Sequence, residues 1–230
     1  MKIIIVGIGN FGGSLAIKLS EAGHEIIAVD DNMSKLDAIK DRITQTVQLD
    51  ATDIEAIKNL PVKEADLVVI AIGENFGSSV MTTAIFKQLH AKKIISRSIS
   101  TLHHTVVDAI GVDEIVSPEQ ESAERLAKKI SMTSVVDSFK LSDDYSIVEI
   151  KLPIKFENKT INEMNFREEY GLNVVTVLRL EETKNIFGKT SKENKAIGVP
   201  TPETKLIEND VLVVFGLRKD IDRFINNHCQ

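Results

Sequence analysis

Three glycines and one acid near the start of the chain have the spacing of a phosphate- and ribose-binding site. Gly7, Gly9 and Gly12 form a G-x-G-x-x-G pattern, and Asp30 follows Gly12 by 18 residues. In this pattern the first glycine permits a tight turn, the second lets the backbone approach a pyrophosphate, and the third lets a helix pack closely on a strand. A carboxylate at the spacing of Asp30 binds ribose hydroxyl groups. These residues therefore predict an adenine-nucleotide site.

The pattern has this meaning only where it joins a strand to a helix, and the flanking residues predict both. Residues 2–6 form an apolar run, residues 14–21 are helix-like, and a second apolar run ends at Asp30. The free N–H groups at the start of such a helix, with its positive dipole end, would face the phosphates.

The alternation of apolar runs and amphipathic segments continues to residue 130. It predicts strands at 3–6, 26–29, 46–49, 67–72, 94–97 and 114–116, and helices at 11–22, 34–40, 54–59, 78–90, 101–110 and 119–130. Strands that alternate with helices in this way form a parallel sheet covered on both faces. We therefore expect a Rossmann-like, doubly wound parallel sheet in an α/β fold.

After residue 131 the pattern changes to that of a small α+β domain. We expect strands at 145–152, 174–180 and 211–215, helices at 160–164 and 219–226, and a loop at 181–205 that contains one short strand at 196–199. The expected organisation is a nucleotide-binding domain at 1–132, a connector at 133–143 and a second domain at 144–230.

Composition excludes several classes of protein. The chain has 230 residues, 43% of them hydrophobic, and a net charge of −6, which argues against a nucleic-acid partner. No apolar run approaches the ~20 residues that a membrane-spanning helix needs. The single cysteine, Cys229, excludes an intrachain disulfide and fits a reducing cytoplasm.

Catalytic motifs are missing from the sequence. The residues four positions after Tyr145 and Tyr170 are Glu149 and Val174, so neither tyrosine begins a Tyr-x-x-x-Lys pair for hydride-transfer chemistry. The chain also has no G-x-S-x-G, no H-E-x-x-H and no P-loop pattern. We expect a binding protein rather than an enzyme, with a small NAD-linked oxidoreductase as the alternative.

Other acids near the glycine pattern have both a binding and a structural interpretation. Asp31 directly follows Asp30 at the end of the second expected strand. The turn Asp50-Ala51-Thr52 is placed to border an adenine ring. The structural alternative is a polar turn in the first case and a helix cap in the second. Glu119 lies in a first helical turn, where a carboxylate is favoured by the helix dipole alone.

An ordered set of short motifs extends over essentially the whole chain. They are GIGNFGG at 7–13, AVD at 28–30, LDAT at 49–52, AIGEN at 71–75, HH at 103–104, IGVD at 110–113, SPE at 117–119, SDDYSIVE at 142–149 and NFREEYG at 165–171. With these motifs the chain resembles the cytosolic regulatory subunits of Ktr/Trk-type potassium uptake systems. Those subunits consist of an RCK nucleotide-binding domain followed by a TrkA-C domain.

The resemblance implies a regulatory function. Members of that family bind ATP, ADP or NAD(H), assemble as homodimers and often as octameric rings, and dock on the cytoplasmic side of a membrane potassium-translocating subunit that they open or close. A nucleotide sensor for some other partner is a further alternative. The implied nucleotide-binding residues are Gly7, Gly9, Asn10, Phe11, Gly12, Asp30, Asp31, Asp50, Ala51, Thr52, Ile72, Gly73, Glu74, Asn75, Arg97 and Glu119.

One departure from the family pattern concerns ligand choice. Several ATP-responsive members have arginine where this chain has Asn10. Asparagine brings no charge, and charge-assisted contacts are about twice as strong as neutral ones. Arg97 is a remaining cation near the expected phosphates, and the resemblance puts Glu119 there too, through a metal ion or a neighbouring subunit. NAD(H), AMP and ADP thus become equal contenders with ATP.

The second domain has a further candidate site. In some family members this domain binds cyclic di-AMP at a dimer interface, and Ile161 and Arg167 occupy the matching positions here. The alternative is that Arg167 makes a structural ion pair with an acid of a partner chain. The second domain also has more apolar residues than one face of a thin sheet can bury, and this favours a dimer. These residues are Ile161, Met164, Val175 and Val177.

Overall fold

The computed structural model describes residues 1–131, 134–184 and 190–229. The chain divides into two compact units, Met1–Gln120 and Glu121–Gln230. The division falls inside helix α6 (Pro118–Ser131). The domain boundaries at 1–132, 133–143 and 144–230 stay predictions.

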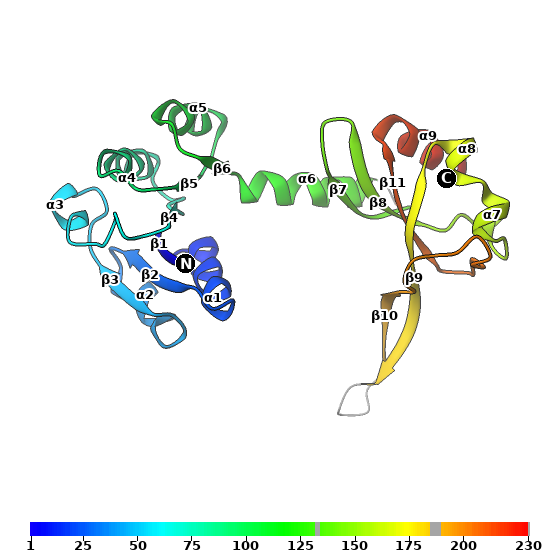
Figure 1. Ribbon diagram of the computed structural model, residues 1–230, viewed down its shortest axis with the longest axis horizontal. Helices are drawn as coiled ribbons and strands as arrows, with labels where there is room; N and C mark the ends of the chain where they lie inside the picture. The colour runs from blue at the N-terminus through cyan, green and yellow to red at the C-terminus, as the bar shows by residue number, and fades with distance from the viewer. Residues whose placement is uncertain (132–133, 185–189, 230) are drawn as a thin grey trace. The chain divides into compact units, whose positions relative to one another are not determined.

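The first unit contains a parallel six-stranded sheet in the order β3-β2-β1-β4-β5-β6 (Figure 1). Its strands are β1 (Lys2–Val6), β2 (Glu25–Asp30), β3 (Gln45–Gln48), β4 (Leu67–Ile70), β5 (Ile94–Arg97) and β6 (Glu114–Val116). β1 pairs in parallel with both β2 and β4, so the strand order reverses there. Such a switch point opens a crevice at the carboxyl ends of the strands. The Rossmann-like parallel sheet is confirmed.

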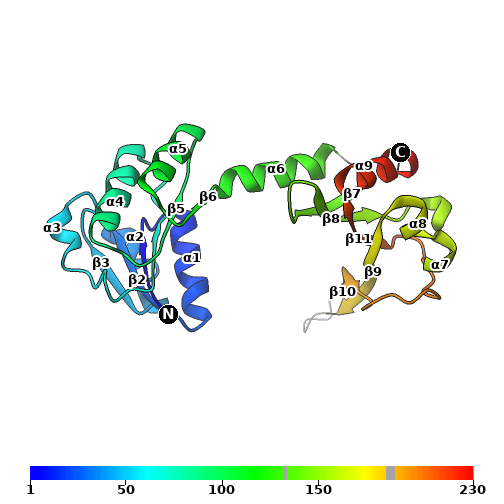
Figure 2. The ribbon, with the colours of Figure 1, turned by 45° about the horizontal axis from the view of Figure 1, so that its top comes forward.

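Helices cover both faces of this sheet (Figure 2). On one face α1 (Asn10–Glu21) and α2 (Met33–Asp37) bury Ala16 and Leu36 against alternate residues of β1. On the other, α3 (Ile54–Ile57) and α4 (Phe76–Gln88) contribute Ile57 and Phe86. A 3-10 turn, η1 (Lys40–Arg42), follows α2, and α5 (Thr101–Ile110) packs beside α4. Because Ile3–Val6 of β1 are buried between the two layers of helices, this stretch is continuously apolar.

Two glycines fix the turn between β1 and α1. Gly7 has a φ of 93°, and its amide donates to the carbonyl oxygen of Val29 at 2.8 Å. A Cβ on Gly12 would lie 1.9 Å from the carbonyl oxygen of Gly7, so the helix can approach the turn only with glycine at this position. A Cβ on Gly13 would meet only the Ile8 side chain, at 3.6 Å.

The second unit contains an antiparallel five-stranded sheet in the order β10-β9-β11-β8-β7. Its helices bury aromatic side chains against the sheet; Phe166 and Phe224, together with Ile150 and Leu212, are members of the core. The elements are β7 (Val135–Lys140), β8 (Tyr145–Lys151), η2 (Ile154–Phe156), α7 (Ile161–Met164), α8 (Phe166–Tyr170), β9 (Asn173–Lys184), β10 (Thr190–Ala196), β11 (Val211–Leu217) and α9 (Arg218–His228).

One strand of this unit was not expected, and one expectation is wrong. Residues 135–140, within the expected connector, form β7, an edge strand in which Val135 alone is fully buried, so its apolar signal is weak. The expected loop at 181–205 is in large part a hairpin of β9 with β10, and 196–199 is not a strand. Residues 192–196 are exposed, so the hairpin has no apolar alternation. Residues 185–189 lie outside the described residues.

A buried ion pair ties β9 to the turn before β11. Asp210 has a fully buried side chain and accepts two hydrogen bonds from the Arg179 guanidinium, at 2.9 and 2.8 Å. It also accepts from the amide of Ile207 at 2.9 Å. The carboxylate thus satisfies donors from both segments.

Alanine at Gly12 should destabilise the protein, whereas alanine at Gly13 should not. The new methyl group at Gly12 collides with a backbone oxygen that cannot move aside, which should cost about 3 kcal/mol. Gly13→Ala keeps ordinary contacts and gains helix propensity, for an effect between zero and about 1 kcal/mol of stabilisation. Urea unfolding followed by circular dichroism measures both. Equal effects of the two substitutions would contradict the packing account.

Asp210→Asn should destabilise the protein far more than Glu181→Gln. The first substitution leaves Arg179 partly buried without its charged partner, at a cost of about 3 kcal/mol. Glu181 is also paired with a cation, Lys195, at 3.2 Å, but both side chains are at least half exposed. Loss of such a surface pair should cost less than about 1 kcal/mol. Urea unfolding of the two variants tests the difference, and similar midpoints would refute it.

Candidate functional site

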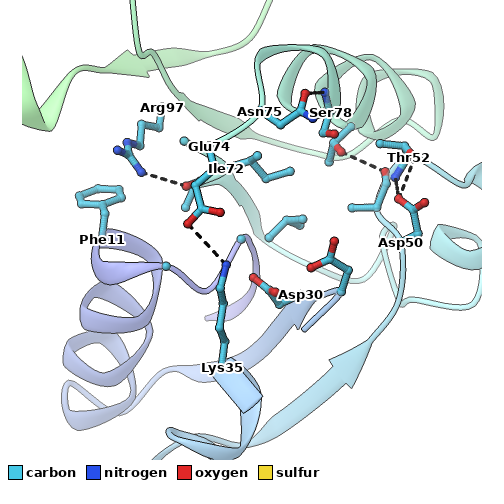
Figure 3. Close-up of a pocket in the computed structure, with 18 of the residues that line it drawn as sticks. Phe11, Asp30, Lys35, Asp50, Thr52, Ile72, Glu74, Asn75, Ser78 and Arg97 are labelled. Carbon is cyan, nitrogen blue, oxygen red and sulfur yellow. Dashed lines mark hydrogen bonds and ion pairs between the residues drawn. The ribbon is translucent and has the colours of Figure 1, made fainter. Parts of the chain in front are cut away.

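A cavity of about 590 Å³ opens at the carboxyl ends of β1, β2, β4 and β5, at the switch point of the first sheet (Figure 3). Its volume lies in the range of small-molecule sites. The lining residues are Val6, Gly7, Gly9, Asn10, Phe11, Asp30, Asp31, Lys35, Leu49, Asp50, Ala51, Thr52, Ala71, Ile72, Gly73, Glu74, Asn75, Ser78, Thr82, Arg97 and Glu119.

The start of α1 forms one wall of this cavity. The helix begins at Asn10, the residue at its N-cap is Gly9, and no side chain caps it. In contrast, Asn32, Asp53, Asn75 and Ser100 each cap the helix that follows with a side-chain oxygen. The first N–H groups of a helix have no partner within the helix. A Cβ on Gly9 would meet nothing within 4 Å, so the space beside this backbone is open.

Asp30 joins two turns at the floor of the cavity. Its side chain accepts from the amide of Ile8 at 2.6 Å and from the amide of Asn32 at 2.9 Å, one bond to each oxygen. The residue is 7% exposed, whereas the neighbouring Asp31 is exposed. Each carboxylate oxygen has a second acceptor position. Asp30 can therefore hold the turns and still accept a hydroxyl group.

The turn after β3 is internally hydrogen bonded. Asp50 accepts from the hydroxyl of Thr52 at 2.7 Å and from its amide at 2.8 Å, which together lower the pKa of the Asp50 carboxyl. The buried hydroxyl of Thr82, on α4, donates to the carbonyl oxygen of Ala51 at 3.0 Å. These bonds fix the shape of this wall of the cavity. The side chain of Ile72, which also lines the cavity, takes no part in them.

Both basic side chains of the lining are paired with lining acids. The Arg97 guanidinium forms an ion pair with Glu119, donates to the carbonyl oxygen of Ala71 at 3.3 Å, and lies 5.8 Å from the centre of the Phe11 ring. The ammonium of Lys35 lies 3.7 Å from a carboxylate oxygen of Glu74. Figure 3 shows Lys35 and Glu74 reaching toward one another from α2 and from the loop after β4.

A second cavity of about 450 Å³ shares Gly73, Arg97 and Glu119 with the first. A Cβ on Gly73 would lie 2.3 Å from an Arg97 nitrogen, so this glycine makes room for the guanidinium. The other lining residues are mostly polar: Ser98, Ile99, Ser100, Thr101, His104, Ser117 and Gln120.

The structure brings together all the nucleotide-site residues expected in the first domain except Gly12, which packs beneath the turn. Sequence reasoning missed Lys35, Ser78 and Thr82. Ser78 and Thr82 are four residues apart on α4, a spacing that puts both on one helix face. Lys35 lies in the short helix after Asp30 at the same edge of the sheet. Other residues missed are strand ends and their neighbours: Val6, Leu49 and Ala71.

In the second unit, Ile161 lies on α7 and packs partly buried against the core, while Arg167 lies on α8 and donates to Asn173 at 2.9 Å. The cyclic di-AMP role of these two residues stays a prediction. Met164 and Val177 are buried within this chain itself, so they do not support a dimer, whereas Val175 is 43% exposed.

The described residues contain neither a metal-binding cluster nor a membrane-spanning helix. That part of the chain has no group of three or more histidine, cysteine, aspartate or glutamate side chains able to hold a metal ion. None of its helices is both long and apolar enough to cross a membrane.

Solved structures share the fold over most of the chain. The GsuK channel aligns with a TM-score of 0.66 at 21% identity, and covers 97% of this chain and 38% of that one. The GsuK channel bound to NAD aligns with a TM-score of 0.63 at 19% identity, with coverage of 97% and 38%. This chain spans less than half the length of those solved chains.

Curated relatives match over the full length. The Ktr system potassium uptake protein A of Bacillus subtilis (strain 168) is 34% identical over 225 residues, 98% of this chain and 96% of that protein. The Ktr system potassium uptake protein C of the same strain is 34% identical over 224 residues, 97% and 95% of the two chains.

Family models match both parts of the chain, the TrkA-N domain at residues 3–118 and the TrkA-C domain at residues 146–228. Their order is the one expected from the sequence motifs. The chain therefore belongs to the family of TrkA-N/TrkA-C proteins that includes the Ktr system potassium uptake proteins.

Proposed function

We propose that this protein is a nucleotide-sensing regulatory subunit of a membrane potassium uptake system. The observation that carries the proposal is the cavity at the switch point, which is lined both by the uncapped start of α1 and by the buried Asp30. The full-length likeness to two Ktr system proteins supports the potassium uptake role.

The proposed ligand is an adenine nucleotide. Its phosphates lie over Gly9 and the first N–H groups of α1, where backbone donors and the helix dipole favour anions. Its ribose hydroxyl groups donate to Asp30, and its adenine ring lies between Ile72 and the turn of Asp50 and Thr52. NAD(H), AMP, ADP and ATP all share these groups; the solved GsuK channel with NAD has the same fold.

The proposed mechanism is regulation by binding. A ligand shifts a conformational equilibrium only if it binds the two conformations with different affinity. The partner is a separate membrane potassium-translocating subunit, which this protein contacts from the cytoplasmic side. The protein does so as a homodimer or as a larger ring, such as the octamer found in the family. Glu119 could add a metal ion, and the second domain could add cyclic di-AMP at Ile161 and Arg167.

Two other functions compete with this one. A small NAD-linked oxidoreductase would oxidise NADH in the presence of a suitable hydride acceptor. A nucleotide sensor for another partner would bind the same ligands but would not co-purify with a membrane potassium transporter. The likeness to the Ktr system proteins favours the regulatory subunit over both.

Gly9→Val should weaken nucleotide binding without unfolding the protein. The valine side chain enters open space in the ligand-free protein, and Gly9 has an extended φ of −83° and ψ of −165° that valine tolerates. It would occupy the space that a phosphate needs, and we expect at least a tenfold loss of affinity, or about 1.4 kcal/mol. Calorimetric titration with AMP, ADP, ATP and NADH measures it. The matched control is Gly13→Ala, outside the cavity lining; unchanged binding by Gly9→Val would refute the phosphate position.

The protein should be a dimer or a larger assembly at micromolar concentration. Met81 on α4 and Leu102 on α5 are 52% and 67% exposed, and contact with a second copy of the chain would bury them. Two interfaces on one chain can close a ring. Light scattering across a concentration series, with nucleotide present, measures the mass. A stable monomer would contradict the assembly and the gating that depends on it.

A further inference from the structure

The cavity is unusually acidic for a site that binds phosphates. Five of its lining residues are acids and two are bases. Within the described part of the chain, each basic lining side chain is already paired with a lining acid, Arg97 with Glu119 and Lys35 with Glu74. The residue at the start of α1, Asn10, adds no charge. The start of α1 can offset part of the negative charge of a bound phosphate chain. Any further phosphate charge in the cavity therefore meets carboxylates rather than free cations.

Glu74 is the acid best placed to act on the ligand. Its side chain is 85% exposed at the mouth of the cavity, whereas Lys35 is 34% exposed and reaches toward it over the cavity (Figure 3). Its carboxylate is paired with Lys35 at 3.7 Å, and the residue before it, Gly73, lies beside the Arg97 guanidinium. A surface pair of this kind is weak, so Lys35 would be free to turn to a phosphate if Glu74 were neutral.

We propose that the Lys35–Glu74 ion pair makes this pocket select adenine nucleotides that carry few phosphate charges. Glu74 repels additional phosphate charge and at the same time occupies Lys35. The favoured ligands are then AMP and a dinucleotide with a bridging pyrophosphate, over ATP without a divalent cation. This selection rests on the proposed nucleotide site and assigns its ligand class.

The test is calorimetric titration of the full-length protein with AMP, NADH, ADP and ATP at low, fixed ionic strength, with a chelator present. Glu74→Gln should raise the ratio of ATP affinity to AMP affinity by about fivefold, because ATP carries more charge toward the removed carboxylate. Since Glu74 is largely exposed, this substitution should leave the fold intact, which circular dichroism checks.

The matched control is Glu64→Gln. Glu64 is also an exposed acid paired with a lysine, Lys2, at 3.2 Å. It precedes β4, however, and so lies at the amino ends of the strands, whereas the cavity lies at their carboxyl ends. The control substitution Glu64→Gln removes the same charge from the protein as Glu74→Gln does. It should leave the ratio of ATP affinity to AMP affinity unchanged. An equal change in both variants would show an effect of net charge alone and would overturn the proposal.

A double variant tests the part assigned to Lys35. Adding Lys35→Gln to Glu74→Gln should lower the raised ratio toward that of the original protein, because the released ammonium is removed. A ratio that stays raised, or no response to Glu74→Gln, would overturn the selection mechanism while nucleotide binding itself stands. If the original protein binds none of the four nucleotides, the proposed nucleotide site fails as well.

Discussion

The carboxylate of Asp30 is the interaction on which the geometry of the site depends. One oxygen accepts from the amide of Ile8, in the turn after β1, and the other from the amide of Asn32, in the turn after β2. These two turns lie on adjacent parallel strands at the switch point of the sheet. A single buried side chain therefore joins the glycine turn to the turn that precedes α2.

Two ion pairs border the cavity, Arg97 with Glu119 and Lys35 with Glu74. Arg97 contacts Phe11, the carbonyl oxygen of Ala71 and Glu119, which is the second residue of α6. A phosphate that approached Arg97 would compete with Glu119 for the guanidinium. Loss of the Arg97–Glu119 pair would remove a side-chain contact at the start of α6.

The sequence predicted the parts of the fold and site that local chemistry determines. The strand ends, the glycine turn and Asp30 follow from apolar runs, steric limits and spacing. Lys35 could not be identified in this way, because its place depends on where the short helix after β2 points the side chain. The hairpin of β9 and β10 was missed because exposed polar strands have backbone pairing but no apolar period. β7 was missed because an edge strand with a single fully buried residue has little apolar signal.

Potassium flux through a reconstituted Ktr-type membrane subunit, with this protein and each nucleotide added in turn, would show whether the cavity regulates uptake. We expect the flux to differ between nucleotides when the protein is present, and this difference to disappear with Gly9→Val. A flux that does not depend on the nucleotide, although the protein binds both the nucleotide and the membrane subunit, would contradict the claim that this cavity regulates potassium uptake.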